Sequence, residues 1–85
     1  FFLYLPLASP HTPVAPTKEW QGRSGLTYYA DFVMQTDWGI GEVLNALDDH
    51  GLAKDTLIIM TSDNGCSPQA DFPALEALGH DPSHV

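Results

Sequence analysis

The chain has 85 residues, of which 44% are hydrophobic and 16% charged, and its formal net charge is -8 at pH 7. Its eleven acidic residues are opposed only by Lys18, Arg23 and Lys54, so no basic stripe is present that could displace counterions from nucleic-acid phosphates. No apolar stretch approaches the roughly 20 residues of a membrane span, and one cysteine cannot form an internal disulfide. The composition therefore indicates a globular segment and argues against a nucleic-acid partner and a membrane span.

The first predicted element is a strand over residues 1–5, a nearly continuous apolar run of Phe, Leu and Tyr. Such a run is typical of a strand that is buried on both faces of a parallel sheet. Because this strand begins with no leader segment before it, and because the chain ends equally abruptly at Val85, we expect the chain to be an interior fragment of a larger domain.

A long loop without periodicity follows from residue 8 to residue 27 and contains Pro10, Pro13 and Pro16. Loops of this length in a compact domain are usually functional or disordered, and the stiffening prolines favour a functional loop. His11 lies between Pro10 and Pro13, which makes it a candidate for proton transfer or anion binding. Taken alone, His11 would more often be an ordinary loop histidine.

The next predicted element is a helix that begins near Thr27 or Tyr28 and ends at Gly51, where a glycine can adopt the left-handed cap conformation. Apolar residues at helical spacing predict one stripe that packs against the sheet. The stripe consists of Tyr29, Val33, Ile40, Leu44 and Leu47.

Two kinds of residue interrupt this helical stripe. Asp37 falls within it, so we expect a buried carboxylate that has a hydrogen-bonding partner or faces a water-filled gap. A structural role for this carboxylate is favoured over a catalytic one. Gly39 and Gly41 weaken a helix intrinsically, and we expect them to permit close backbone packing.

The second predicted strand covers residues 56–61 and runs directly into a turn, Ser62-Asp63-Asn64-Gly65. A carboxylate and a carboxamide side by side, where a strand ends and the chain turns on a glycine, make half of a site for a hard cation. Asp63 and Asn64 are therefore the candidate metal ligands. Beyond this turn, residues 70–78 are predicted to form a short helix that ends at Gly79.

Together these elements predict an α/β fold built on a βαβ unit. Two parallel strands joined by a helix place both of their carboxyl ends at one edge of the sheet. The loop that carries His11 therefore faces the turn that carries Asp63 and Asn64. Since open parallel sheets bind ligands at this edge, we expect the functional site there.

Four segments, in this order and with these gaps, resemble the type I sulfatases, particularly the bacterial arylsulfatases. They are residues 1–4, Ser9-Pro10-His11-Thr12-Pro13, the helix with Thr36, Asp37 and Gly41, and residues 61–68. The resemblance covers essentially the whole chain. It implies an alkaline-phosphatase-like fold with a mostly parallel central sheet, in which residues 1–85 would be part of the catalytic domain. It also implies export to the periplasm or the extracellular space.

The resemblance assigns a role to three residues. Asp63 and Asn64 would bind a calcium ion, whose charge would lower the barrier to attack at sulfur. His11 would contact the sulfate group and protonate the leaving oxygen. The family nucleophile is a formylglycine, made from the cysteine of a Cys-x-Pro-x-Arg motif, which we expect in an N-terminal region outside this chain. The implied activity is hydrolysis of a small-molecule or carbohydrate sulfate ester, and we expect the fragment alone to be inactive.

Cys66 matches the nucleophile motif only in part. Pro68 lies at the correct spacing, but Ala70 stands where the family has arginine, and the segment follows the metal turn instead of preceding it. We therefore expect Cys66 to be a small buried thiol near the site and not the nucleophile. No family role falls on the other candidates, which are Lys18, His50, His80 and His84.

Three other functions stay open. Phosphodiesterases, phosphatases and phosphonate hydrolases of the same fold often carry histidine at the position of Asn64, a nitrogen ligand that suits zinc, so Asn64 favours a sulfatase. A non-catalytic homologue would bind sulfated ligands without turnover, and its gene would lack the Cys-x-Pro-x-Arg segment. A calcium-binding structural module is disfavoured, because Gly65 and Ala74 occupy positions where an EF-hand needs ligands.

Overall fold

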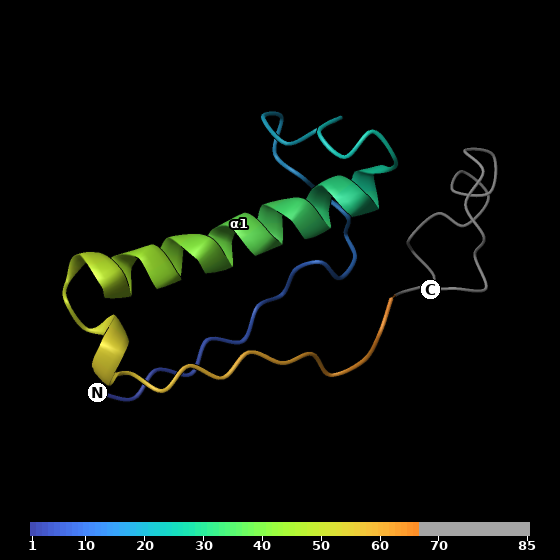
Figure 1. The fold of residues 1–85 in the computed structure, drawn as a ribbon. Helices are drawn as coiled ribbons and strands as arrows, with labels where there is room; N and C mark the ends of the chain where they lie inside the picture. The colour runs from blue at the N-terminus through green and yellow to red at the C-terminus, as the bar shows by residue number, and fades with distance from the viewer. Residues whose placement is uncertain (67–85) are drawn as a thin grey trace.

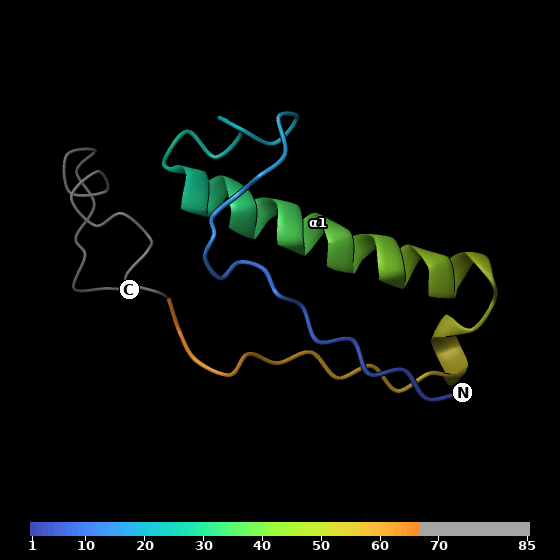
Figure 2. The same cartoon turned by 180° about the vertical axis from the view of Figure 1, so that it is seen from behind.

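The computed structural model describes residues 1–66, which contain two helices. Helix α1 spans Tyr28–Asp49, and η1 is a single 3-10 turn over Ala53–Asp55. One extended segment, residues 1–7, precedes the loop before α1, and another, residues 56–62, follows η1 (Figures 1 and 2). Both extended segments run in the same direction, opposite to that of α1 (Figure 1).

Local capping groups fix both ends of α1. The Thr27 hydroxyl accepts a hydrogen bond of 3.2 Å from a backbone N–H in the first turn. At the other end Gly51 has φ +67°, and the N–H groups of Gly51 and Leu52 donate to the carbonyls of Asp48 and Leu47 at 3.0 and 2.8 Å. These two bonds form a Schellman motif, in which glycine adopts the left-handed conformation without a Cβ clash. The predicted bounds of the helix are confirmed.

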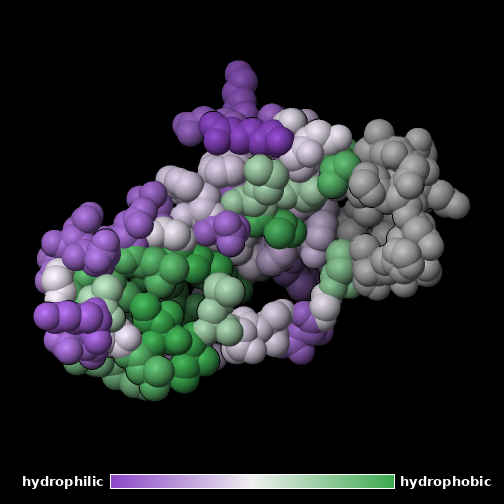
Figure 3. All heavy atoms as spheres, viewed as in Figure 1, coloured by the Kyte–Doolittle hydropathy of each residue, from purple (hydrophilic) through white to green (hydrophobic). Residues whose placement is uncertain are grey.

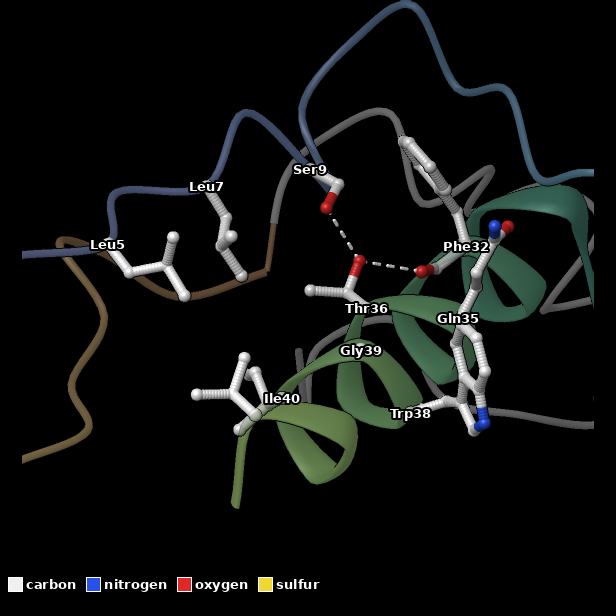
Figure 4. A pocket seen from close by; sticks show the side chains of 10 residues that line it. Leu5, Leu7, Ser9, Phe32, Gln35, Thr36, Trp38, Gly39 and Ile40 are labelled. Atoms are coloured by element: carbon white, nitrogen blue, oxygen red, sulfur yellow. Dashed lines mark hydrogen bonds between the residues drawn. The ribbon is translucent and has the colours of Figure 1, made fainter. Parts of the chain in front are cut away.

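The packed face of α1 is rotated from the predicted stripe, because residues 5–9 lie against the side of the helix that carries Thr36 and Ile40 (Figure 4). Val33 and Leu44, which were predicted to face the sheet, are each 40% exposed, whereas Tyr29, Ile40 and Leu47 of the same predicted stripe are half-buried. Asp37 is also exposed, so the prediction of a buried carboxylate at this position is wrong. The half-buried residues of this face are Phe32, Gln35, Thr36, Gly39, Ile40, Val43 and Leu47.

The two glycines inside α1 do not mark close packing. A Cβ atom built at Gly39 or at Gly41 meets no atom within 4 Å. The prediction of close backbone approach is therefore wrong within residues 1–66. Gly39 instead lines a cavity between α1 and residues 5–9.

The predicted sheet is unconfirmed, because the described part of the chain contains no β-strand. Residues 1–7 and 56–62 follow the parallel path of a βαβ unit, but no hydrogen-bonded ladder joins them. Their apolar side chains are exposed: Phe2 is 92% exposed and Leu57 86%. Figure 3 shows the apolar surface gathered at the end of the molecule where residue 1 lies. Apart from residues 5–7, which lie against α1, these segments are largely uncovered within residues 1–66, so their predicted burial in a sheet stays a prediction.

Helix α1 has 22 residues but carries several carboxylates. Accordingly, no helix within residues 1–66 is long and apolar enough to cross a membrane. The helix predicted over residues 70–78, its end at Gly79, and His80 and His84 all lie outside the described residues.

Candidate functional site

The buried carboxylate of α1 belongs to Asp31, a residue that the sequence analysis did not single out. Asp31 is 2% exposed, and its two oxygens accept hydrogen bonds from the backbone N–H groups of Gly22 at 2.7 Å and Ser24 at 2.9 Å. The Ser24 side chain and then these two N–H groups hold the pKa of Asp31 below its ordinary value, although burial acts in the opposite direction. The first turn of a helix also favours a negative charge. An acidic residue in the first turn was the only sequence signal for this contact.

Two further residues of α1 hold the earlier part of the loop. The Thr17 backbone N–H donates to the Gln35 side-chain oxygen at 2.9 Å. The Thr36 hydroxyl lies 2.8 Å from both the Ser9 hydroxyl and the Phe32 carbonyl oxygen (Figure 4). Because a carbonyl only accepts, both bonds form when Thr36 donates to Phe32 and Ser9 donates to Thr36. Polar side chains of α1 thus hold the loop at several points along its length.

An aromatic contact adds to this attachment. The rings of Trp20 and Trp38 lie 5.8 Å apart at an interplanar angle of 46°, and the Arg23 guanidinium lies 4.4 Å from the centre of the Trp20 ring. Tilted aromatic pairs and cation–π contacts of this kind are each worth about 0.5–1.5 kcal/mol. Lys18, in the same stretch of loop, is exposed.

His11 is exposed and lies in a short turn, because its backbone N–H donates to the Ala8 carbonyl at 3.2 Å. The peptide bonds before Pro10 and Pro13 are both cis. The Nδ1 atom of His11 lies 2.9 Å from the Thr12 carbonyl oxygen and 3.2 Å from the Thr12 hydroxyl. Thr12 thus engages Nδ1, and no described residue hydrogen-bonds to Nε2. The Nε2 atom is therefore the one that can exchange a proton with a ligand.

The candidate metal ligands lie in an exposed turn. The Ser62 hydroxyl donates to the Asn64 carbonyl at 2.6 Å, and the Asn64 side-chain amide donates to the Gly65 carbonyl at 2.9 Å. The Asp63 carboxylate and the Asn64 Oδ1 atom accept no hydrogen bond from residues 1–66. Both residues offer oxygen ligands, which suit a hard cation such as calcium. Calcium takes six to eight oxygen ligands, so this turn would supply only part of its coordination shell. Within residues 1–66, no group of three His, Cys, Asp or Glu side chains could hold a metal ion.

The structure places the two predicted halves of the site at the same end of the molecule. The loop with His11 and the turn with Asp63 and Asn64 both lie near the end where α1 begins (Figures 1 and 2). This placement agrees with the parallel path predicted for the two segments. No hydrogen bond between described residues joins His11 to Asp63 or Asn64, so their joint action stays a prediction.

A cavity of about 280 Å³ lies between residues 5–9 and α1 (Figure 4). Most of its lining is apolar, including Leu5, Leu7, Phe32 and Ile40, so it offers no site for a cation or a sulfate group. Cys66 is exposed, and its predicted burial near the site is therefore wrong.

Comparisons with known proteins agree with one another. The Sulfatase family model matches residues 1–82. The chain is 45% identical over 65 residues to an N-acetylgalactosamine-6-O-sulfatase of Bacteroides thetaiotaomicron, a match that covers 76% of this chain and 13% of that protein. It is 40% identical over 79 residues to a steryl-sulfatase of Mus musculus, a match that covers 93% of this chain and 13% of that protein. It is 43% identical over 65 residues to arylsulfatase H of Homo sapiens, a match that covers 76% of this chain and 12% of that protein.

The chain therefore spans about an eighth of the length of these curated relatives. No solved structure gives a significant match.

Proposed function

The chain belongs to the sulfatase family, and on this basis we propose that residues 1–85 are part of the catalytic domain of a sulfuric ester hydrolase. The observation that carries the proposal is the family match over residues 1–82, which includes His11, Asp63 and Asn64. Their placement at one end of the molecule supports it (Figure 1). The alkaline-phosphatase-like fold with a mostly parallel sheet belongs to the same proposal.

His11 is proposed to protonate the leaving oxygen. When the S–O bond of the ester breaks, the departing alkoxide or phenoxide needs a proton. In the imidazolium form of His11, Nδ1–H donates to the Thr12 carbonyl and Nε2–H is the proton that can be given to the leaving oxygen. The Thr12 contacts would also orient the ring. Proton donation of this kind typically contributes about a hundredfold to ten-thousandfold in rate.

Asp63 and Asn64 are proposed to hold one calcium ion, with the remaining ligands supplied from outside residues 1–66. A bound calcium would neutralise charge on the sulfate oxygens as a Lewis acid. The Asn64 amide is oriented for this role, because its nitrogen donates to the Gly65 carbonyl and its oxygen is left for the metal. The nucleophile is proposed to be a formylglycine from outside this chain, since Ala70 follows Cys66 where the family motif has arginine.

The substrate is proposed to be a small-molecule or carbohydrate sulfate ester. The names of the relatives include an N-acetylgalactosamine-6-O-sulfatase and steryl-sulfatases, so the shared feature is the sulfate ester and not the alcohol. A phosphodiesterase of the same fold is disfavoured, because Asn64 provides an oxygen ligand where those enzymes often carry a histidine.

The proposal is tested with the complete protein, produced together with a formylglycine-generating enzyme. Nitrophenyl sulfate and bis-nitrophenyl phosphate serve as paired substrates, and the metal content of the purified protein is measured by mass spectrometry. We expect hydrolysis of the sulfate ester and about one calcium per chain. Faster hydrolysis of the phosphate diester, together with bound zinc, would overturn the proposal.

A further inference from the structure

We infer that Thr36 of α1 is a positioning residue for His11 and that it acts through the Ser9 hydroxyl. The inference rests on the proposed function, because it concerns how the proposed proton donor is held. In this role Thr36 does not contact the ester. Its effect on catalysis would come from the position of the loop.

The first step of the argument is the rigidity of Thr36. Its hydroxyl is bonded at 2.8 Å to the Phe32 carbonyl one turn earlier in the helix, and Thr36 is half-buried. A β-branched side chain in a helix has few rotamers, and the bond to the carbonyl selects one of them. The Thr36 oxygen is therefore a fixed point on α1.

The second step is the attachment of the loop to that point. The Ser9 hydroxyl lies 2.8 Å from the Thr36 hydroxyl, and Ser9 is half-buried (Figure 4). The two residues are 27 positions apart in the chain, so this bond joins the loop to a separate element. A half-buried bond of this kind competes less with water than an exposed one.

The third step is the stiffness of the short link between Ser9 and His11. Only Pro10 separates them, and its ring fixes the backbone angle φ. The His11 backbone N–H closes the turn onto the Ala8 carbonyl at 3.2 Å. The imidazole is then held by Thr12 through Nδ1. From α1 to the imidazole, the position of each group is thus restricted by a hydrogen bond or by the proline ring.

The other bonds from α1 hold the loop farther from His11. Gln35 binds the backbone at Thr17, and Asp31 binds it at Gly22 and Ser24, all of which follow His11. On the other side of Ser9, Leu5 and Leu7 border the cavity of about 280 Å³. Ser9 and Thr36 line the same cavity. Of these bonds between α1 and the loop, the one between Ser9 and Thr36 is the nearest to His11 in the chain, so it is well placed to set the position of the turn.

The test uses the complete protein and four variants: Ser9→Ala, Thr36→Val, the double variant, and Thr36→Ser. Valine keeps the shape of threonine and removes the hydroxyl, whereas serine keeps the hydroxyl. For an alkyl sulfate with a poor leaving group, we expect Ser9→Ala and Thr36→Val each to lower kcat roughly tenfold with KM nearly unchanged. The double variant should lose no more than the worse single variant, because both break the same bond. Thr36→Ser should keep the activity.

Thr56→Val is the matched control. The Thr56 hydroxyl also donates to a carbonyl four residues earlier, that of Leu52, but within residues 1–66 it bonds to no residue of the loop before α1. This control loses the same kind of local bond and should leave kcat unchanged. Crystal structures of the variants give a readout that does not depend on activity, because the His11 ring should be displaced or disordered in Thr36→Val and unchanged in Thr56→Val.

Additive losses in the double variant, or an unmoved His11 in Thr36→Val, would overturn the inference. If Thr36→Val does not fold, Ser9→Ala and Thr36→Ser still make opposite predictions for kcat and for the position of His11. If the unmodified protein hydrolyses no sulfate ester, the proposed function fails, and the crystal structures alone decide whether Thr36 positions His11.

Discussion

Asp31 and Ser24 join helix α1 to the loop that precedes it. The Ser24 backbone N–H donates to the Asp31 carboxylate at 2.9 Å, and the Ser24 side chain is the largest cause of the lowered pKa of this carboxyl group. The Gly22 N–H completes the contact at 2.7 Å. The first turn of α1 and residues 22–24 therefore form one hydrogen-bonded unit.

Asp31→Asn should destabilise the complete protein by about 1–3 kcal/mol, because it replaces two charge-assisted bonds with weaker ones and turns an amide N–H₂ toward backbone donors. The free energy of unfolding in urea measures the loss. Asp37→Asn is the control, since Asp37 is an exposed residue of the same helix. Equal stability of the two variants would contradict the role of Asp31.

The contribution of Asp31 should depend on pH. The pKa of Asp31 in the folded protein is lowered from its ordinary value of 3.8, so its charged form is favoured by folding. The stability difference between the unmodified protein and Asp31→Asn should be full above about pH 4 and should shrink as the pH falls through the lowered pKa. Urea titrations between pH 3 and pH 7 measure this difference. A stability difference that grows on acidification would contradict the lowered pKa of Asp31.

Gly51→Ala should cost about 1–2 kcal/mol, because an L-residue with a Cβ atom is strained at φ +67°. Gly51→Asn should cost less, since asparagine tolerates the left-handed conformation better than alanine. Thermal unfolding of both variants gives the comparison. The reverse order of the two melting temperatures would argue that Gly51 matters for a reason other than its backbone angle.

Asp63→Ala should abolish most activity and weaken calcium binding, and Asn64→Ala should do so less, because it removes a neutral ligand. Isothermal titration with calcium and activity assays on the complete protein measure both effects. Asp55→Ala, which removes an exposed carboxylate of η1, is the control. Full activity and full calcium affinity in both variants would show that Asp63 and Asn64 are not metal ligands.

His11→Ala should reduce kcat more for an alkyl sulfate than for nitrophenyl sulfate, because nitrophenoxide leaves without much help from an acid. Steady-state kinetics with the two esters give the ratio. His50→Ala is the control, since the His50 ring is exposed and its Nδ1 atom lies 2.8 Å from the Ala46 carbonyl, at the opposite end of α1. Equal losses for both esters would leave His11 as a sulfate ligand and would exclude the proton-donor role.

The sequence by itself determined the bounds of α1 and the family. Thr27 and Gly51 cap the helix through bonds to residues within five positions, and such short-range bonds can be predicted from residue type and spacing alone. The resemblance to the sulfatases rests on motifs in a fixed order, and the family match over residues 1–82 confirms it.

Only the tertiary structure decided which face of α1 is packed and which carboxylate is buried. Asp37 and Asp31 both occur in helical sequence, but Asp31 is buried because backbone N–H groups of the loop meet it there. The bond between Ser9 and Thr36 likewise joins residues 27 positions apart, and no local sequence pattern predicts it. Contacts between distant residues depend on the path of the whole chain, so neither periodicity nor propensity can select them.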